Sequence, residues 1–421
     1  MFVGAQRLIA GGAMATALGC SQNVYLGHPF GRDAQPLPAD ASPPADARPP
    51  PPDTSNYPWY LHAVGSKLVD SSGSEVRLKG INWSGMETAR RVVDGLHRRS
   101  LETLVAQIES LGFNLIRIPF SDDSVSATSV PMSADQLAAN PDLVGMTSLQ
   151  VLDQILDTAA AHHLRVILDR YRFRATQTSP PPSTWYSGPD PGSPLNGSPE
   201  QLWLDNWVAI AERYTTRPNF VGCDLHDEPK TPSTWGDDNL NVDWRMAAER
   251  AGNAILGVNP KLLVIVEGID VVGGQRYWPG GNLRGARTAP VRLTPASQLA
   301  YSIHDYGMSV NASMPWFSDP TFPNNLPTLW TDNWGYLVME NTSPVIIGAF
   351  GDRKPEMGID PAWVMGDEAW RPALMSYVAA NQLSFIFWSL SPSAEGKTGL
   401  LLLSDWQTPD PEWTMTLQLT P

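Results

Sequence analysis

Two adjacent carboxylates are the clearest candidates for acid–base chemistry in this sequence. Asp227 and Glu228 follow the apolar run 221–226 and precede Pro229. Partial burial and a neighbouring carboxylate both raise a carboxyl pKa, so we expect a raised pKa at Glu228, which suits a general acid. The alternative is a structural salt bridge between Glu228 and a buried arginine, for which Arg117 is the best-placed partner.

Polar and aromatic side chains that can form hydrogen bonds or transfer protons lie at or near the carboxyl ends of the other apolar runs. They are Arg117, Asp169, Arg170, Tyr171, Glu267, His304, Tyr306 and Trp388, whereas Ala349 occupies such a position without a polar group. In a barrel of parallel strands the carboxyl ends of all strands meet at one face, where the chemistry of that fold takes place. We therefore expect these side chains to surround one site.

Eight apolar runs are expected to form the strands that position these side chains. They are 76–81, 115–120, 165–169, 221–226, 262–267, 299–304, 345–350 and 384–389. Between them, apolar residues recur at helical spacing, as in 101–111 and 149–159. This alternation predicts a single α/β domain with the (β/α)8, or TIM barrel, fold. A doubly wound open sheet is the alternative, but no glycine-rich phosphate loop follows the first run.

The composition excludes several classes of partner. The 421-residue chain has 29 basic and 43 acidic residues, a formal net charge of −14, which disfavours nucleic acid and anionic membranes. Sixteen tryptophans favour a neutral sugar ligand, because an indole offers a flat apolar face. The histidines of the body lack the spacing of paired metal ligands, so we expect neither a metal nor another cofactor. We expect a monomer.

The first 56 residues are expected to direct export and not to fold. Residues 1–20 look like a signal segment, with Arg7 followed by an apolar stretch too short to span a bilayer. Cys20 at its end suits a bacterial lipoprotein signal, in which that cysteine is acylated; an ordinary signal with an incidental cysteine is the alternative. Residues 21–56 form a linker that is rich in proline at 36–52. Residues 57–421 form the barrel of an exported, extracellular or cell-surface protein, with Cys223 as its single cysteine.

Longer motifs resemble glycoside hydrolase family 5, and most closely its bacterial endo-β-1,4-glucanases, or cellulases. The matching segments are 79–83, 112–121, 224–229, 243–254, 301–306, 316–325 and 387–389. They occur in the family's order and cover nearly all of the chain from about Trp59 to Trp406. The resemblance implies that the ligand is a β-1,4-linked glucan or a related polysaccharide.

The resemblance also implies a retaining mechanism, in which an acid/base and a nucleophile lie about 5–5.5 Å apart. Glu228 matches the acid/base, but the segment that carries the family's nucleophilic glutamate reads Gly348-Ala349-Phe350-Gly351. Two further positions depart from the family, because Asp227 replaces an asparagine and Tyr171 replaces a histidine. Alanine cannot attack an anomeric carbon, and an ionised Asp227 accepts hydrogen bonds but cannot donate one.

Other positions that match the family are expected to bind the sugar. They are Arg117, His304, Tyr306 and Trp388, together with the altered positions Tyr171 and Asp227. Trp388 is expected to form the floor of the central subsite, and Trp83 and Trp316 are further candidates for stacking on sugar rings.

Three functional hypotheses remain open. The first is a β-glucan-directed hydrolase with impaired catalysis, and the second is a noncatalytic carbohydrate-binding pseudoenzyme. The third is an active glycosidase in which Asp227, Asp352 or Glu356 replaces the missing carboxylate. An inverting mechanism needs a base about 6.5–9.5 Å from Glu228. Asp227 and Glu228 are neighbours, and the side chains of neighbouring residues on an extended segment point apart, so such a distance is compatible with Asp227 as the base.

Overall fold

The described part of the chain lies within one unit. The computed structural model describes residues 56–126, 129, 133–176, 184–186, 199–354, 358–392 and 398–418. The chain divides into two units, residues 1–46 and 47–421, and all described residues belong to the second. The predicted signal segment and all but the last residue of the predicted linker lie outside the described residues. In the described ranges, no helix combines the length and the apolar character needed to cross a membrane.

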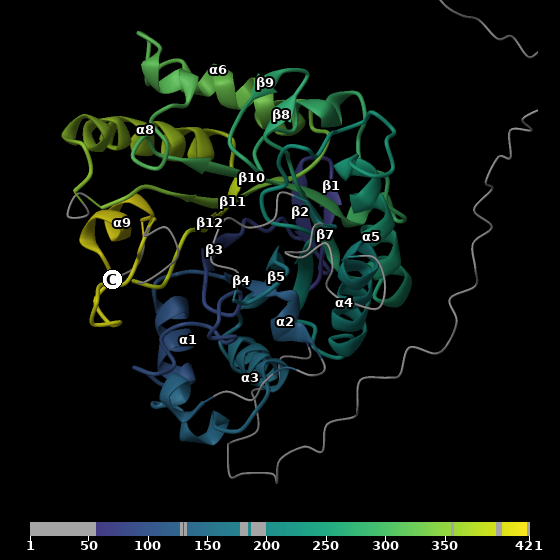
Figure 1. The fold of residues 1–421 in the computed structure, drawn as a ribbon, viewed down its shortest axis with the longest axis vertical. Helices are drawn as coiled ribbons and strands as arrows, with labels where there is room; N and C mark the ends of the chain where they lie inside the picture. Colours follow the sequence, from purple (N-terminus) through teal and green to yellow (C-terminus); the bar gives the residue numbers. More distant parts are fainter. Residues whose placement is uncertain are drawn as a thin grey trace, which may run out of the picture. The chain divides into compact units, whose positions relative to one another are not determined.

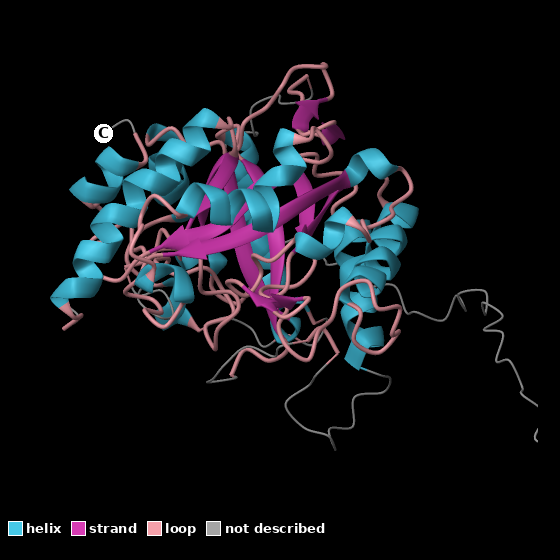
Figure 2. Ribbon diagram, turned by 90° about the horizontal axis from the view of Figure 1, so that it is seen from above, coloured by secondary structure: helices cyan, strands magenta, loops and turns pink. Residues whose placement is uncertain are grey.

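Eight parallel strands close into a barrel, and helices surround it (Figures 1 and 2). In their order around the barrel they are β3 (Lys79–Asn82), β4 (Leu115–Ser121), β5 (Arg165–Arg172), β6 (Phe220–Asp224), β7 (Leu263–Glu267), β10 (Leu299–Tyr306), β11 (Val345–Gly351) and β12 (Ser384–Phe387). Each predicted run overlaps one of these strands, so the prediction of a (β/α)8 barrel is confirmed. The alternative of an open sheet is wrong, because β12 pairs with β3 and leaves no edge.

The helices follow the strands and pack apolar faces against the barrel. They are α1 (Leu101–Ser110), α2 (Asp122–Val125), α3 (Ser148–Ala161), α4 (Pro199–Arg213), α5 (Trp244–Val258), α6 (Leu326–Trp330), α7 (Tyr336–Met339), α8 (Pro361–Ala380) and α9 (Pro411–Thr416). Helix α3 begins with a capping box of Thr147 and Gln150. Its buried residues include Leu152, Ile155 and Ala159, which are the apolar face that the sequence predicts.

Strand β4 shows how the barrel separates its core from its site. Ile116, Ile118 and Phe120 alternate along the strand and belong to the large core cluster between strands and helices. Leu115 belongs instead to the smaller cluster inside the barrel, and Arg117 points the same way one step further along. Two-residue alternation therefore places an apolar side chain near the start of the strand and a charged one near its carboxyl end.

A hairpin closes the barrel at the amino-terminal ends of the strands. Strands β1 (Leu61–Val64) and β2 (Lys67–Asp70) pair antiparallel, and Trp59, Leu61 and Leu68 pack against the apolar residues inside the barrel. Arg165, the first residue of β5, donates from Nε to the carbonyl of Trp59 at 3.0 Å. Apolar side chains therefore fill the amino-terminal end of the barrel, and the polar side chains of the predicted site lie at the carboxyl ends of the strands.

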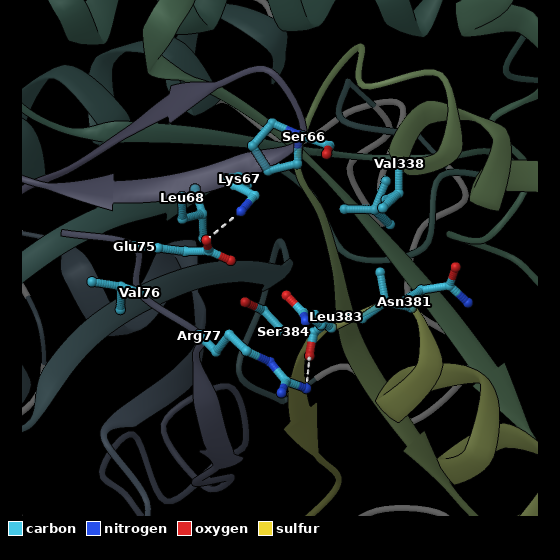
Figure 3. Close-up of a pocket in the computed structure, with 13 residues that line it drawn as sticks. Ser66, Lys67, Leu68, Glu75, Val76, Arg77, Val338, Asn381, Leu383 and Ser384 are labelled. Carbon is cyan, nitrogen blue, oxygen red and sulfur yellow. Dashed lines mark hydrogen bonds and ion pairs between the residues drawn. The ribbon is translucent and has the colours of Figure 1, made fainter. Parts of the chain in front are cut away.

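A pocket lies beside this hairpin, at the amino-terminal ends of β3, β11 and β12 (Figure 3). Its charged side chains are paired: Lys67 Nζ lies 2.5 Å from Glu75, and Arg77 donates to the carbonyl of Leu383 at 3.3 Å. The pocket therefore lies at the end of the barrel opposite the predicted site, and these contacts join the hairpin to the barrel.

Candidate active site

A buried guanidinium holds together the carboxyl ends of four neighbouring strands. Arg117 on β4 is fully buried, and its Nη2 contacts Asp224 at 2.8 Å, Glu267 at 3.0 Å, Asp169 at 3.2 Å and Asp227 at 3.5 Å. Asn82, at the end of β3, accepts from Nη1 of Arg117 at 3.1 Å and donates to the carbonyl of Gly348 at 2.9 Å. We call Arg117 and its four carboxylates the charge cluster.

Asp224 and Asn82 are members of this site that the sequence interpretation did not single out. Both are the last residues of barrel strands, and both have side chains buried in the site. Their position at strand ends is the signal that could have found them. The oxygens of the charge cluster lie close enough together to coordinate a metal ion, but the guanidinium of Arg117 already supplies the positive charge between them.

Glu228 lies at the rim of the charge cluster. Its backbone has a φ of +48°, and its N–H donates to Oε2 of Glu267 at 2.8 Å, which holds this sparsely populated conformation. Its Oε1 lies 3.1 Å from Nδ1 of His304, and its side chain is 21% exposed. Asp227 points instead towards Arg117, so the two neighbouring side chains diverge. The alternative of a salt bridge between Glu228 and Arg117 is therefore wrong, since it is Asp227 that contacts this arginine.

His304 bridges two glutamates. Its Nδ1 contacts Glu228 and its Nε2 contacts Oε1 of Glu267, each at 3.1 Å. Burial lowers the pKa of His304, but Glu267, Glu228 and Asp227 outweigh burial and raise this pKa well above its ordinary value. Burial raises the pKa of Glu228, but the hydrogen bond and charge of His304 outweigh it, so the pKa is lowered. The prediction of a raised pKa at Glu228 is therefore wrong.

Ala349 lies beside His304 in the barrel wall. The two residues are paired in the register of β10 and β11. The Ala349 side chain is 1% exposed and clusters with Trp388, while Tyr171 and Tyr306 pack against them. The rings of Tyr171 and Trp388 are stacked, with centroids 6.3 Å apart and planes inclined by 13°. Aromatic rings therefore surround the position at which the resemblance expects a nucleophilic carboxylate.

The tryptophans predicted to bind sugar differ in their environment. Trp83 is fully buried in the main core, and its indole N–H donates to the carbonyl of Asp94 at 2.8 Å. Since it has no free face, the prediction that Trp83 stacks on a sugar is wrong. Trp316 is 7% exposed and packs against Tyr277 and Trp278, whereas Trp388 is 6% exposed beside Ala349. The roles of Trp316 and Trp388 in binding stay predictions.

The comparison with family models decides the family. Residues 69–394 match the model described as Cellulase (glycosyl hydrolase family 5). The chain belongs to glycosyl hydrolase family 5. This confirms the family resemblance, and the match spans all eight strands of the barrel.

Family 5 relatives of this chain are named as endoglucanases. An endoglucanase of Paenibacillus polymyxa is 41% identical over 359 residues, covering 85% of each chain. The major extracellular endoglucanase of Xanthomonas campestris is 34% identical over 357 residues, covering 83% of this chain and 69% of the relative.

Solved structures of family 5 endocellulases share the fold. A hyperthermophilic endocellulase of Pyrococcus horikoshii has a TM-score of 0.76 at 34% identity, covering 85% of this chain and 97% of that chain. The catalytic domain of the Xanthomonas campestris endoglucanase has a TM-score of 0.75 at 32% identity, covering 85% and 98%. Two structures of the Pyrococcus protein are cellotetraose complexes of variants in which a glutamate is replaced by alanine.

The stability of this family 5 barrel is expected to fall as the pH rises. Burial raises the pKa values of Asp305 and Asp352 to about 6, above the ordinary value of 3.8. Folding therefore takes up protons between these values, and the unfolding free energy declines as the pH rises through them. His304 acts in the same direction, because its raised pKa makes the folded state bind a proton that the unfolded state releases.

Thermal unfolding followed by circular dichroism checks this. We expect a higher Tm at about pH 5.5 than at about pH 8, with a smaller difference in the Asp305→Asn variant. Asp305 accepts from the indole N–H groups of Trp330 at 2.8 Å and Trp370 at 2.7 Å on different oxygens, and asparagine keeps only one of these acceptors. The variant is therefore expected to be less stable at both pH values, and only the difference between its two Tm values is compared with that of the unmodified chain. A Tm that rises between these two pH values would contradict the expectation.

Proposed function

We propose that this chain binds β-1,4-linked glucan at the carboxyl ends of its barrel strands and hydrolyses it slowly or not at all. The observation that carries this proposal is Ala349, which stands beside His304 and Trp388 where the family places its nucleophile. Glu228 keeps the acid/base position and a partly exposed side chain. A site with its acid but without its nucleophile lacks the group that must attack the anomeric carbon.

The relatives support the choice of ligand. Proteins that share this fold at 34% identity are endocellulases, and glutamate-to-alanine variants of one of them hold cellotetraose. Loss of a glutamate in that protein is thus compatible with binding of a β-1,4-linked oligosaccharide. We infer that the same holds for this chain, which has alanine at position 349.

The candidates for a substitute carboxylate are poorly suited to the role. Asp352 is 1% exposed and forms an ion pair of 2.6 Å with Arg371 of α8, on the outer side of the barrel wall. Asp227 is 3% exposed, and burial together with the charges of Glu267 and Glu228 raises its pKa well above the ordinary value, which disfavours the ionised form that a general base needs. Glu356 lies outside the described residues. These features favour impaired catalysis over an active glycosidase with a replacement base.

Binding of cello-oligosaccharides by calorimetry tests the proposal. We expect cellotetraose to bind the unmodified chain, and Trp388→Ala to weaken binding by about 1–2 kcal/mol through loss of an aromatic face. The matched control is Trp363→Ala, because Trp363 is 37% exposed on α8 and does not belong to the cluster around Ala349. Absence of binding by the unmodified chain, or equal losses in the two variants, would contradict the proposal.

We also propose that the barrel is exported and held at a membrane surface through a lipid on Cys20. The support is the sequence alone: a signal-like segment ending at Cys20 and a proline-rich stretch of about 3.1 Å per residue that would act as a spacer. We expect the unmodified protein in the membrane fraction and Cys20→Ser released from it, as judged by fractionation and immunoblotting. Unmodified protein in the medium with a mature terminus beyond Cys20 would contradict the anchor.

A further inference from the structure

The candidate site contains more carboxyl groups than cations. Five carboxyl groups meet there, those of Asp169, Asp224, Asp227, Glu228 and Glu267. The buried cations in contact with them are Arg117 and His304, and Lys230 adds a charge at the rim, 4.0 Å from Glu228. Like charges in a buried site cannot all persist, so some of these carboxyl groups must hold protons.

The contacts indicate which carboxyl groups are ionised. Glu267 lies 3.0 Å from Arg117 and 3.1 Å from His304, and it also accepts the backbone N–H of Glu228. Asp224 accepts from Nε of Arg117 at 2.9 Å and lies 2.8 Å from its Nη2. Each of these two carboxylates has two bonds to cations, which favour the charged form.

Asp227 has the weakest contact with a cation in the charge cluster. Its Oδ1 is 3.5 Å from Nη2 of Arg117, and its Oδ2 accepts no hydrogen bond from the residues that the structure describes. Asp169 also has a single contact, at 3.2 Å, and neither of its oxygens accepts a hydrogen bond from the described residues, so it too is a candidate for a proton; its side chain is completely buried, whereas that of Asp227 is 4% exposed. Asp227 is therefore the weakly paired carboxyl group that retains contact with the open side of the site.

We propose that Asp227 is a neutral carboxylic acid in the folded protein, and that its O–H donates a hydrogen bond to a hydroxyl group of bound glucan. The protonated state is supported by the contacts of the charge cluster, while the donated bond rests on the proposed function. A neutral carboxylic acid has one O–H donor, and the NH2 group of an asparagine at the same position could donate a hydrogen bond as well. The Asp227 in this chain thereby keeps the donor of the family's asparagine, contrary to the expectation for an ionised aspartate.

The groups around Asp227 agree with this assignment. The charged and titratable side chains that face it are Arg117 on β4, Asp169 on β5, Asp224 on β6, Glu228 after β6, Glu267 on β7, and His304 and Tyr306 on β10. Burial and Glu267 raise the pKa of Asp227, and Glu228 adds to them; His304 and Arg117 oppose the rise without cancelling it.

Infrared spectroscopy of the full chain tests the protonated state without any ligand. At neutral pH we expect the difference spectrum between unmodified protein and Asp227→Asn to show the loss of one protonated carboxyl band. The control is Asp319→Asn, because Asp319 is exposed and its pKa is lowered by hydrogen bonds from Thr321, so this change should remove only an ionised carboxylate band. Loss of an ionised band in Asp227→Asn would overturn the proposal.

Calorimetry with cellotetraose tests the donated bond. At about pH 6 we expect the unmodified chain and Asp227→Asn to bind within about threefold of each other, and Asp227→Ala to bind about tenfold more weakly. Binding by Asp227→Asn that is tenfold tighter than the unmodified chain would mean an ionised aspartate and overturn the donor role. No binding by any of the three would overturn the proposed function and the donor role together, while the infrared result still decides the protonated state.

Discussion

The unmodified chain is expected to release aryl alcohol from an activated aryl β-cellobioside on the order of 10^4-fold more slowly than a family 5 enzyme with its nucleophile, or not measurably. An activated leaving group departs without protonation, so this substrate isolates the step that Ala349 cannot perform. The methyl group of Ala349 has neither a lone pair for attack nor a charge to stabilise an oxocarbenium-like transition state. Continuous absorbance of the released aryl alcohol measures the rate.

Placing a glutamate at position 349 tests whether the missing nucleophile alone accounts for the low activity. We expect Ala349→Glu alone to recover little activity, because Tyr171 and Trp388 pack on this position and the family resemblance predicts a histidine where Tyr171 stands. The double variant Ala349→Glu with Tyr171→His is expected to have a higher hydrolytic activity than Ala349→Glu alone. Hydrolysis of soluble β-glucan at ordinary cellulase rates by the unmodified chain, abolished by Glu228→Gln, would show that another carboxylate serves as nucleophile or base.

Removing the central arginine is expected to cause the largest loss of stability. Arg117 is fully buried and contacts four carboxylates, so Arg117→Met leaves several acidic groups without their shared cation. Removing one partner of a buried ion pair costs about 3–5 kcal/mol of unfolding free energy. The loss should be larger at about pH 8 than at about pH 5, because the freed carboxyl groups can take up protons at the lower pH.

Denaturant unfolding measures this difference against a surface control. Lys67 pairs with Glu75 while 55% of its side chain is exposed, so Lys67→Met is expected to cost at most about 1 kcal/mol. Both variants remove one positive charge and introduce methionine, but Arg117 is buried among four carboxylates whereas Lys67 is exposed beside one. If the unfolding free energies of Arg117→Met and Lys67→Met agree within about 1 kcal/mol, the charge cluster does not contribute as its contacts imply.

The barrel could be predicted because its signals are local. Each strand is a short apolar run, and each intervening helix shows its own apolar face, as Leu152, Ile155 and Ala159 do in α3. The same local pattern indicated that Glu228 and His304 stand at strand ends. The barrel topology predicts that all strand ends lie at one face. The local sequence pattern does not show which side chains contact each other at that face.

Two predictions, the raised pKa of Glu228 and the sugar-stacking role of Trp83, were wrong. The first depends on a residue that is distant in the sequence, and the second depends on the direction of the side chain. The pKa of Glu228 is lowered because of His304, which lies 76 positions further along the chain. A neighbouring carboxylate and burial were visible in the sequence, but this hydrogen bond was not. Trp83 directly follows β3, and its position alone could not show that its ring enters the core between strands and helices and not the site.

The hairpin of β1 and β2 also determines the end of the barrel at which residue 56 enters it. Trp59 and Leu61 pack at the amino-terminal ends of the strands, so the chain that precedes residue 56 must join the barrel on the side away from Glu228 and Trp388. The lipid proposed on Cys20 would therefore be connected to the end of the barrel opposite Glu228 and Trp388. A polysaccharide fibre can then approach the mouth from the side opposite the point of attachment, and a reporter fused before residue 56 should not obstruct it.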